Sequence, residues 1–327
     1  MMTLSTMKKI VDSLDENWKS PVADEIAARW KADKGSVDYI RSSANFVFTF
    51  QRGGKRFFLR FNSISERSKE EIAAEIEILN TLNEQSDVIA RPVLSSNDQF
   101  VEELQTVNDS YLAVVFEGFG GKMYEIEELG PEKFFLWGKA LGHLHKLFDE
   151  IPEHLLIKRK SRRDHVDFIE GHLPGTEKAA QKELETIEHL YEKIEEKKGL
   201  IHFDFELDNL IWDGERINII DFDDAAVYGY GADLAFALRD LFEGSIDTHN
   251  PLFNQFIEGY ATEFKYDDNL FDNLPLYLRF HNLLTFTKLV RSLDYTVEAS
   301  TPNWLKGLHA KLTRVVDQYR ESFGSYQ

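Results

Sequence analysis

The sequence predicts an α+β protein of two lobes, with an antiparallel sheet in the amino-terminal lobe and mainly helices in the carboxyl-terminal lobe. Two observations lead to this class. Strand-like runs separated by turn residues crowd into the first third of the chain, and long helical patterns dominate after Gly118. The length of 327 residues fits two domains or one domain of two lobes. We therefore predict lobes at residues 1–117 and 118–327.

The amino-terminal lobe is predicted to begin with a three-stranded antiparallel meander over residues 37–61. Its runs VDYIR, FVFTF and KRFFLRF are rich in β-branched and aromatic residues, and turn residues at 42–45 and 53–54 separate them. Over residues 65–82 apolar residues recur every three or four positions, which indicates a helix. Two further strands are expected at 90–95 and 111–116. The predicted order is strand, strand, strand, helix, strand, strand.

The carboxyl-terminal lobe is predicted to be almost entirely helical. Pro131 stands at a favourable first helical position, and the apolar pattern continues to Phe148. The charge-rich run 176–198 is typical of a solvated helix. Only the segment 200–224 has the character of strands and loops. Further helical patterns lie at about 231–243, 250–265, 273–293 and 303–322.

Composition narrows the classes of function. The chain has no cysteine, which excludes disulfides, thiolate nucleophiles and cysteine-ligated metals. Its formal net charge of −19 argues against a nucleic-acid partner, because phosphate backbones would be repelled. No apolar run approaches the length of a signal peptide or a membrane span. We therefore expect a cytoplasmic protein without a membrane partner, and the sequence leaves its oligomeric state open.

Residues 201–224 carry the clearest chemical signal. Two strand-like runs flank Asp213-Gly214, a strong signal for an antiparallel hairpin. Such a hairpin brings Asn209, just before its first strand, next to Asp221, just after its second. His202, Asp204 and Asp208 reach the same end on the preceding loop. Oxygen ligands of this kind suit Mg²⁺, which takes one or two protein carboxylates together with phosphate oxygens and water.

This arrangement, HxDxxxxN followed by Ile-Asp-Phe, resembles the catalytic and metal-binding loops of kinases. More narrowly, it is similar to the aminoglycoside phosphotransferase and choline kinase group, over about residues 35–290. The resemblance implies a protein-kinase-like fold. It also implies that Asp204 is the catalytic base, that Asn209 and Asp221 hold the metal ions, and that His202 braces the loop. Asp233, in an Asp-Leu-Ala context, is expected to stabilise this loop as a helix cap.

The resemblance also assigns residues of the amino-terminal lobe to the nucleotide. Ser43 and Asn45 occupy the position of the loop that covers the phosphates, although a simple turn is the alternative. Arg60 stands where kinases usually have a lysine and is expected to contact the nucleotide phosphates. Glu75 lies on the apolar face of its helix, where a carboxylate needs a partner. Arg60 is the natural partner of Glu75, and Glu71 is the second candidate for this pair.

Two further sets of residues complete the predicted site. Glu117 and Phe119 follow a hydrophobic strand and resemble the hinge that binds adenine. Asp223 and Asp224 extend the acidic cluster after Asp221. We interpret them as a solvated acidic loop, and contact with a cationic or polyhydroxyl acceptor is the alternative.

The sequence thus predicts an ATP-dependent phosphotransferase, with GTP as the other candidate nucleotide and Mg²⁺ as the cofactor. It would move the γ-phosphate to a hydroxyl of a small molecule such as an aminoglycoside or choline. A protein Ser/Thr kinase is disfavoured because no Ala-Pro-Glu sequence follows Asp221. The remaining alternative is a catalytically weak or silent nucleotide-binding scaffold. The identity of the acceptor is open.

Overall fold

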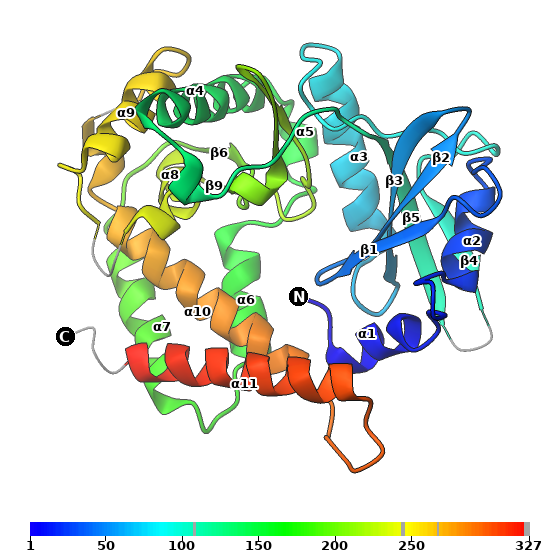
Figure 1. Cartoon of the computed structure of the whole chain (residues 1–327). Coiled ribbons are helices and arrows are strands. Elements are labelled where there is room, and N and C mark those ends of the chain that lie inside the picture. Colours follow the sequence, from blue (N-terminus) through cyan, green and yellow to red (C-terminus); the bar gives the residue numbers. More distant parts are fainter. Residues whose placement is uncertain (107–108, 243–245, 267, 324–327) are drawn as a thin grey trace.

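The computed structural model describes residues 1–106, 109–242, 246–266 and 268–323. Its amino-terminal lobe contains a five-stranded antiparallel sheet in the order β1-β2-β3-β5-β4 (Figure 1). The strands are β1 (Asp38–Ser42), β2 (Phe46–Arg52), β3 (Lys55–Ser63), β4 (Glu102–Gln105) and β5 (Ser110–Glu117). The predicted meander is thus present, with its turn at Gly53-Gly54, where both glycines have positive φ.

Three helices accompany this sheet. Helix α3 (Lys69–Asn83) corresponds to the predicted helix and begins with a capping box formed by Ser68 and Glu71. Its buried apolar side chains belong to the core of the molecule. Helices α1 (Leu4–Val11) and α2 (Pro21–Ala28) precede the sheet and were not predicted.

The predicted strand at 90–95 is wrong. This segment makes isolated bridges only, because it runs between the lobes instead of along a neighbouring strand. Ala90 N donates to Ile219 O at 2.9 Å, whereas Val93 N donates to Val115 O at 2.8 Å. The remaining strand of the sheet is β4, where buried and exposed residues alternate.

The carboxyl-terminal lobe is mainly helical, as predicted (Figure 1). Its helices are α4 (Pro131–Phe148), α5 (Glu153–Leu156), α6 (Arg162–His172), α7 (Lys178–Tyr191), α8 (Tyr230–Ala237), α9 (Pro251–Ala261), α10 (Leu274–Ser292) and α11 (Asn303–Ser322). Two small antiparallel pairs cross it, β6 (Lys198–Ile201) with β9 (Ala226–Gly229) and β7 (Leu210–Asp213) with β8 (Arg216–Ile219). The second pair is the hairpin that the sequence predicted. Within the described ranges, no helix is long and apolar enough to cross a lipid bilayer.

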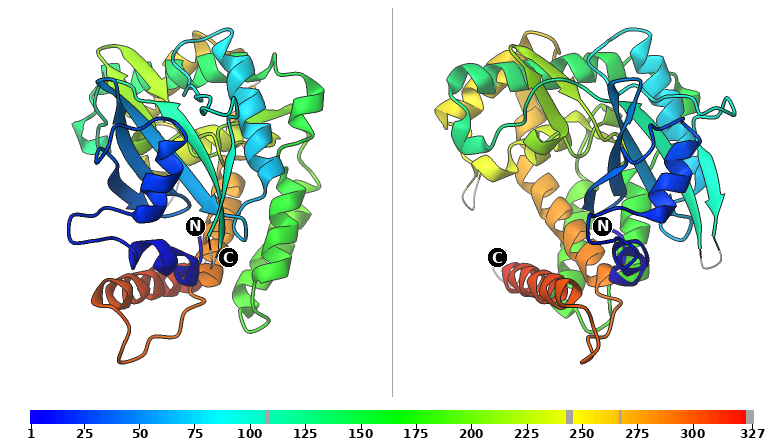
Figure 2. Two further views of the ribbon diagram at one scale, coloured as in Figure 1. Left: turned by 90° about the vertical axis from the view of Figure 1, so that its right-hand side faces the viewer. Right: turned by 45° about the vertical axis from the view of Figure 1, so that its right-hand side comes forward.

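The first helix of the chain packs against the last. Helix α1 contacts α11, and both views in Figure 2 show the two helices side by side. Ser5 N donates to Asp294 Oδ1 at 3.0 Å, and Trp304 Nε1 donates to Asp12 Oδ1 at 3.2 Å. These contacts join the two lobes at the end of the molecule where both α1 and α11 lie.

Helices α4 and α9 cross at van der Waals distance because each has a glycine at the crossing. A Cβ at Gly138 would lie 1.8 Å from Phe256 O, and a Cβ at Gly259 would lie 1.9 Å from Phe135 O. Both of these contacted atoms are backbone oxygens, so room for a Cβ can be made only if a whole helix moves. The crossing is therefore closely packed and leaves no room for a side chain at either glycine.

We expect Gly138→Ala to lower the free energy of unfolding by about 3 kcal/mol, because an added methyl group forces two helix backbones apart. Urea unfolding followed by circular dichroism measures the change. Gly171→Ala is the matched control, because Gly171 lies in α6 with no atom within 4 Å of its added Cβ. There alanine should stabilise by up to about 1 kcal/mol. Equal stabilities of the two variants would contradict the packing argument.

Candidate active site

The loop between β6 and β7 is held by buried polar contacts. Asp233 accepts hydrogen bonds from His202 N and Phe203 N, both at 2.7 Å. His202 is fully buried, and its Nε2 lies 3.1 Å from Ile220 O. Asp233 therefore stabilises the loop, as predicted. It does so from within the first turn of α8, whereas the N-cap residue of α8 is Gly229. The expected capping role is wrong.

Asp204 and Asn209 lie side by side in this loop. Asn209 Nδ2 donates to Asp204 Oδ2 and to Asp204 O, each at 2.9 Å. The amide oxygen of Asn209 is buried, and it makes no hydrogen bond with the described residues. Ile220 N donates to Asn209 O at 3.0 Å, so the hairpin places Asp221 next to Asn209. An unpartnered buried oxygen beside a carboxylate is a ready position for a cation.

Asp221 follows β8 with a left-handed backbone, φ 65°. Arg60 Nη1 lies 3.1 Å from its Oδ1, and Arg41 Nη2 lies 3.4 Å from its Oδ2. Burial, reinforced by the negative charge of Asp223, raises the pKa of Asp221, while Arg60 opposes this rise. A divalent cation at this carboxylate would offset the cost of its burial.

Arg60 and Glu75 form the buried ion pair that the apolar position of Glu75 predicts. Arg60 comes from β3 with a side chain 8% exposed, and Glu75 comes from α3 with a side chain 1% exposed. The guanidinium of Arg60 therefore bridges Glu75 and Asp221. Glu71, the second candidate, instead pairs with Lys160 at 2.8 Å. The Arg60–Glu75 pair links the sheet, the helix and the loop after β8.

A cavity of about 130 Å³ lies between the lobes at this point. Arg60, Glu75, Glu117, Phe119 and Asp221 all contribute to its wall. The remaining wall is largely apolar and includes Val47, Ala90, Phe116, Met123, Ile211 and Ile220. A largely apolar cavity with a few charged groups in its wall suits a flat heterocycle that carries phosphates.

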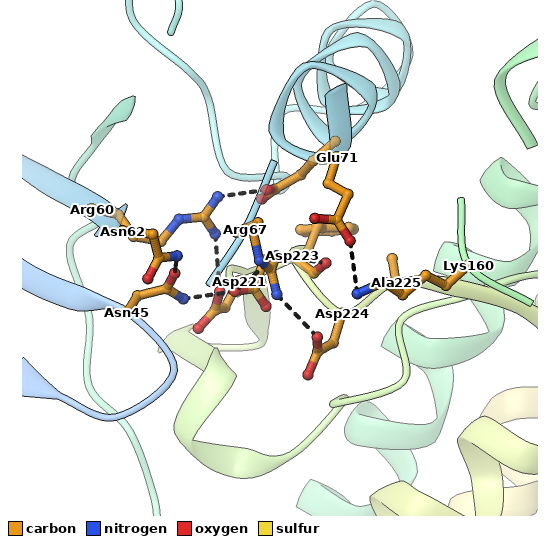
Figure 3. Close-up of polar contacts among 12 residues, drawn as sticks. Asn45, Arg60, Asn62, Arg67, Glu71, Lys160, Asp221, Asp223, Asp224 and Ala225 are labelled. Atoms are coloured by element: carbon orange, nitrogen blue, oxygen red, sulfur yellow. Dashed lines mark hydrogen bonds and ion pairs between the residues drawn. The ribbon is translucent and has the colours of Figure 1, made fainter. Parts of the chain in front are cut away.

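Ser43 and Asn45 do not contribute to the wall of this cavity. Asn45 is 3% exposed, and its Nδ2 donates to Asp223 Oδ2 at 2.6 Å (Figure 3). Its Oδ1 accepts a hydrogen bond from Asn62. Ser43 O accepts a hydrogen bond from Met2 N at 3.0 Å. The side chain of Asn45 thus braces the loop after β8, and nucleotide binding by Ser43 and Asn45 stays a prediction.

The interpretation of Asp223 and Asp224 as a solvated loop is wrong. Arg67 lies 3.2 Å from a carboxylate oxygen of each (Figure 3). Lys288 Nζ lies 3.1 Å from Asp224 Oδ2. Although burial favours the neutral form, Arg67 holds the pKa of Asp223 below its usual value. Arg159 adds hydrogen bonds to the backbone oxygens of residues 222, 223 and 225. This ionic cluster fixes the loop that carries Asp221.

Sequence patterns missed three arginines of this region, Arg41, Arg67 and Arg159. Their partners lie 180, 157 and 66 positions away along the chain in the hydrogen bonds Arg41–Asp221, Arg67–Asp224 and Arg159–Ala225. Local periodicity carries no signal at such separations. The sequence offers one hint of a role in the site, which is that Arg41 directly precedes the loop at 42–45.

His165 packs behind the loop that carries Asp204. Its Nδ1 lies 2.6 Å from Tyr228 Oη, and its ring centroid lies 5.0 Å from that of Phe203. Burial, with a smaller contribution from Lys288, lowers the pKa of His165 to about 3. The folded state therefore binds this proton only at much lower pH than the unfolded state, whose histidines titrate near 6.5.

This difference predicts that acidification destabilises the fold. Between the two pKa values the unfolded state binds more protons, so stability falls as the pH drops below about 6.5. We expect wild type to lose about 1 kcal/mol more than His165→Gln between pH 7.5 and pH 5.5. Urea unfolding of both proteins at the two pH values measures this, and equal losses would exclude His165 as the cause.

The oxygen atoms of Asp221 and Asn209 suit a cation that also binds phosphate oxygens. They suit a cation surrounded by protein ligands less well. Across the described segments, no three His, Asp or Glu side chains gather as a set of metal ligands. A site shared with phosphate oxygens needs only one or two protein ligands. Asp221 and the unpartnered oxygen of Asn209 meet that requirement.

The chain belongs to the phosphotransferase enzyme family, whose model matches residues 39–267. Amicoumacin kinase of Bacillus subtilis (strain 168) is 21% identical over 286 residues, which cover 84% of this chain and 85% of that protein. The predictions of a small-molecule phosphotransferase and of a protein-kinase-like fold are thereby confirmed.

Solved structures agree in fold. An amicoumacin kinase in complex with AMP-PNP, Ca²⁺ and Ami superimposes with a TM-score of 0.79 at 18% identity, covering 97% of this chain and 95% of that chain. A microcompartment-associated aminopropanol kinase gives a TM-score of 0.64 at 20% identity, covering 93% and 98%. A spectinomycin phosphotransferase in complex with ADP and spectinomycin gives a TM-score of 0.62 at 14% identity, covering 93% and 97%.

Proposed function

We propose that this protein transfers the γ-phosphate of ATP to a hydroxyl of a small, amine-bearing molecule, with a divalent cation as cofactor. The observation that carries the proposal is the meeting of Arg60, Glu75 and Asp221 on one cavity wall, beside the hydrogen-bonded pair Asp204 and Asn209. Phosphoryl transfer requires alignment and charge neutralisation more than covalent catalysis by the protein. These side chains can supply both.

Asp204 is assigned as the general base. The acceptor oxygen forms a bond to the γ-phosphorus, the bond from that phosphorus to the bridging oxygen of ADP breaks, and the hydroxyl proton passes to Asp204. Asn209 Nδ2 keeps the carboxylate of Asp204 in position through its hydrogen bond at 2.9 Å. This bond also turns the amide oxygen of Asn209 away from Asp204.

Asn209 and Asp221 are assigned as the metal ligands. A bound Mg²⁺ supplies positive charge to the phosphate oxygens. Arg60 lies 3.1 Å from Asp221 and is assigned to the phosphates near that metal. Glu75 keeps the guanidinium of Arg60 in place, so an arginine can serve where kinases usually have lysine.

The largely apolar cavity between the lobes is assigned to the adenine of ATP. Glu117 N and Gly118 N already donate to Arg91 O at 3.0 Å and to Arg56 O at 3.1 Å. Recognition of adenine by a backbone N–H at the hinge is therefore assigned to Phe119. Related proteins of the same fold have been solved with AMP-PNP and with ADP, which supports ATP over GTP.

A second cavity, of about 380 Å³, is lined in part by residues 206–208, which follow Asp204 in the same loop, and is assigned to the acceptor. Four acidic residues contribute to its wall, Glu125, Glu206, Asp208 and Asp240. Burial, with the neighbouring charge of Asp204, raises the pKa of both Glu206 and Asp208. A protonated amine on the acceptor would relieve this crowding of carboxylates, as Arg239 partly does for Glu206.

A transfer screen tests the proposed function. The protein is incubated with Mg·ATP or Mg·GTP and with aminopropanol, aminoglycosides, choline, homoserine, sugars or a generic protein, and both ADP release and the mass of the acceptor are recorded. Asp204→Asn is the blank. We expect transfer to an amino alcohol or aminoglycoside by wild type only. Nucleotide binding without transfer to any acceptor would favour the silent scaffold, and transfer to the protein acceptor alone would favour a protein kinase.

A cytoplasmic location and the absence of a nucleic-acid partner remain predictions from composition and charge.

A further inference from the structure

We propose that Arg41 binds the γ-phosphate and guides it from the nucleotide to the acceptor, an inference that rests on the proposed function. Arg41 lies in β1, directly before the loop at 42–45. Its Nη2 lies 3.4 Å from Asp221 Oδ2, and its Nη1 lies 3.8 Å from Asp208 Oδ2. Its side chain also contributes to the wall of the nucleotide cavity.

Arg41 contacts one carboxylate from the wall of each cavity. Asp221, on one side of its guanidinium, lines the nucleotide cavity. Asp208, on the other side, lines the acceptor cavity. A phosphoryl group that passes from ATP to an acceptor must cross between these cavities. The guanidinium of Arg41 therefore lies beside the path of transfer.

Arg41 and Arg60 differ in how firmly they are held. Arg60 is 8% exposed and bridges two carboxylates in the interior. Arg41 is 42% exposed, and both of its carboxylate contacts are longer than those of Arg60. Exposed pairs of this kind contribute at most about 1 kcal/mol. Arg41 can therefore exchange partners at little cost, whereas Arg60 cannot.

Asp221 would hold the proposed metal, and a cation there would neutralise the carboxylate that Arg41 now contacts at 3.4 Å. The exchange of partners by Arg41 would then be favourable. Arg41 then faces the phosphates of the incoming nucleotide, and a planar guanidinium can bind two phosphate oxygens at once. Negative charge spreads over the oxygens of the γ-phosphoryl group during transfer, and a mobile arginine beside them stabilises that charge.

The test compares nucleotides that differ in the γ-phosphate. Calorimetry measures the Kd of Mg·AMP-PNP and of Mg·ADP for wild type, Arg41→Met and Arg41→Lys. We expect Arg41→Met to lose roughly tenfold or more in affinity for Mg·AMP-PNP and less than about threefold for Mg·ADP, because one charge-assisted contact to the γ-phosphate is removed. Arg41→Lys should fall between the two, because a lysine keeps the charge without the planar fork.

Lys55→Met is the matched control, because it removes one positive charge from an exposed position of the same sheet. It should leave the ratio of the two Kd values unchanged. Equal losses for both nucleotides in Arg41→Met, or no loss, would overturn the inference and leave Arg41 as a simple ion pair between the lobes. If Arg41→Met does not fold, the ratio for Arg41→Lys decides. Failure of wild type to bind either nucleotide would instead overturn the proposed function itself.

Discussion

Replacement of Asp204 by asparagine is expected to lower kcat by about 1,000-fold, because a positioned general base contributes on the order of 10²–10⁴ to proton transfer. The affinity for Mg·ATP should change by less than about threefold, since the base is not assigned to the nucleotide. Asparagine keeps an oxygen for the hydrogen bond from Asn209 Nδ2, so the loop should keep its shape. Steady-state kinetics with an acceptor from the screen and calorimetry with Mg·AMP-PNP measure the two effects.

Asp213→Asn provides the control for this experiment. Asp213 is exposed at the end of β7, directly before the Gly214-Glu215 turn, and asparagine suits such a position as well as aspartate does. The same chemical change at this position should leave kcat within about twofold. Substantial transfer by Asp204→Asn would remove Asp204 as the base.

The second large effect is expected at Asp221. Mutation of a residue that only hydrogen-bonds to a metal ligand typically costs about 10–100-fold in metal affinity. Asp221→Asn changes the proposed ligand itself, so it should weaken Mg²⁺-dependent binding of AMP-PNP by about 100-fold. Calorimetry with Mg²⁺ and with EDTA separates the metal contribution. In EDTA, wild type and variant should agree within about threefold, because Arg60 and the largely apolar cavity are intact. An equal loss in EDTA would indicate damage to the cavity and contradict the assignment of Asp221 to the metal.

The parts of the site that the sequence could predict are those set by short-range patterns. Asp213-Gly214 between two apolar runs was enough to place Asn209 beside Asp221, because a two-residue turn fixes the register of a hairpin. The pairing of Glu75 with Arg60 followed from a carboxylate on an apolar helix face. Both inferences needed only a local pattern and one physical constraint.

The parts that the sequence could not predict depend on distant partners. The sequence predicted that Asp223 and Asp224 form a solvated acidic pair. In the structure, cations from three separate segments surround them, namely Arg67, Arg159 and Lys288. No spacing rule connects these positions. Helix α2 is different, because Ser20 followed by Pro21 is a start signal that was present in the sequence and was overlooked.

The packing of α1 against α11 has a consequence for how the chain folds. Asp12, at the end of α1, and Trp304 of α11 are 292 positions apart, so closing this contact requires almost the whole chain to be ordered or brought together. During synthesis the residues of α11 leave the ribosome after everything they pack upon. The surface of α1 that packs against α11 therefore stays uncovered until α11 docks. Contacts between residues so far apart in the sequence form slowly.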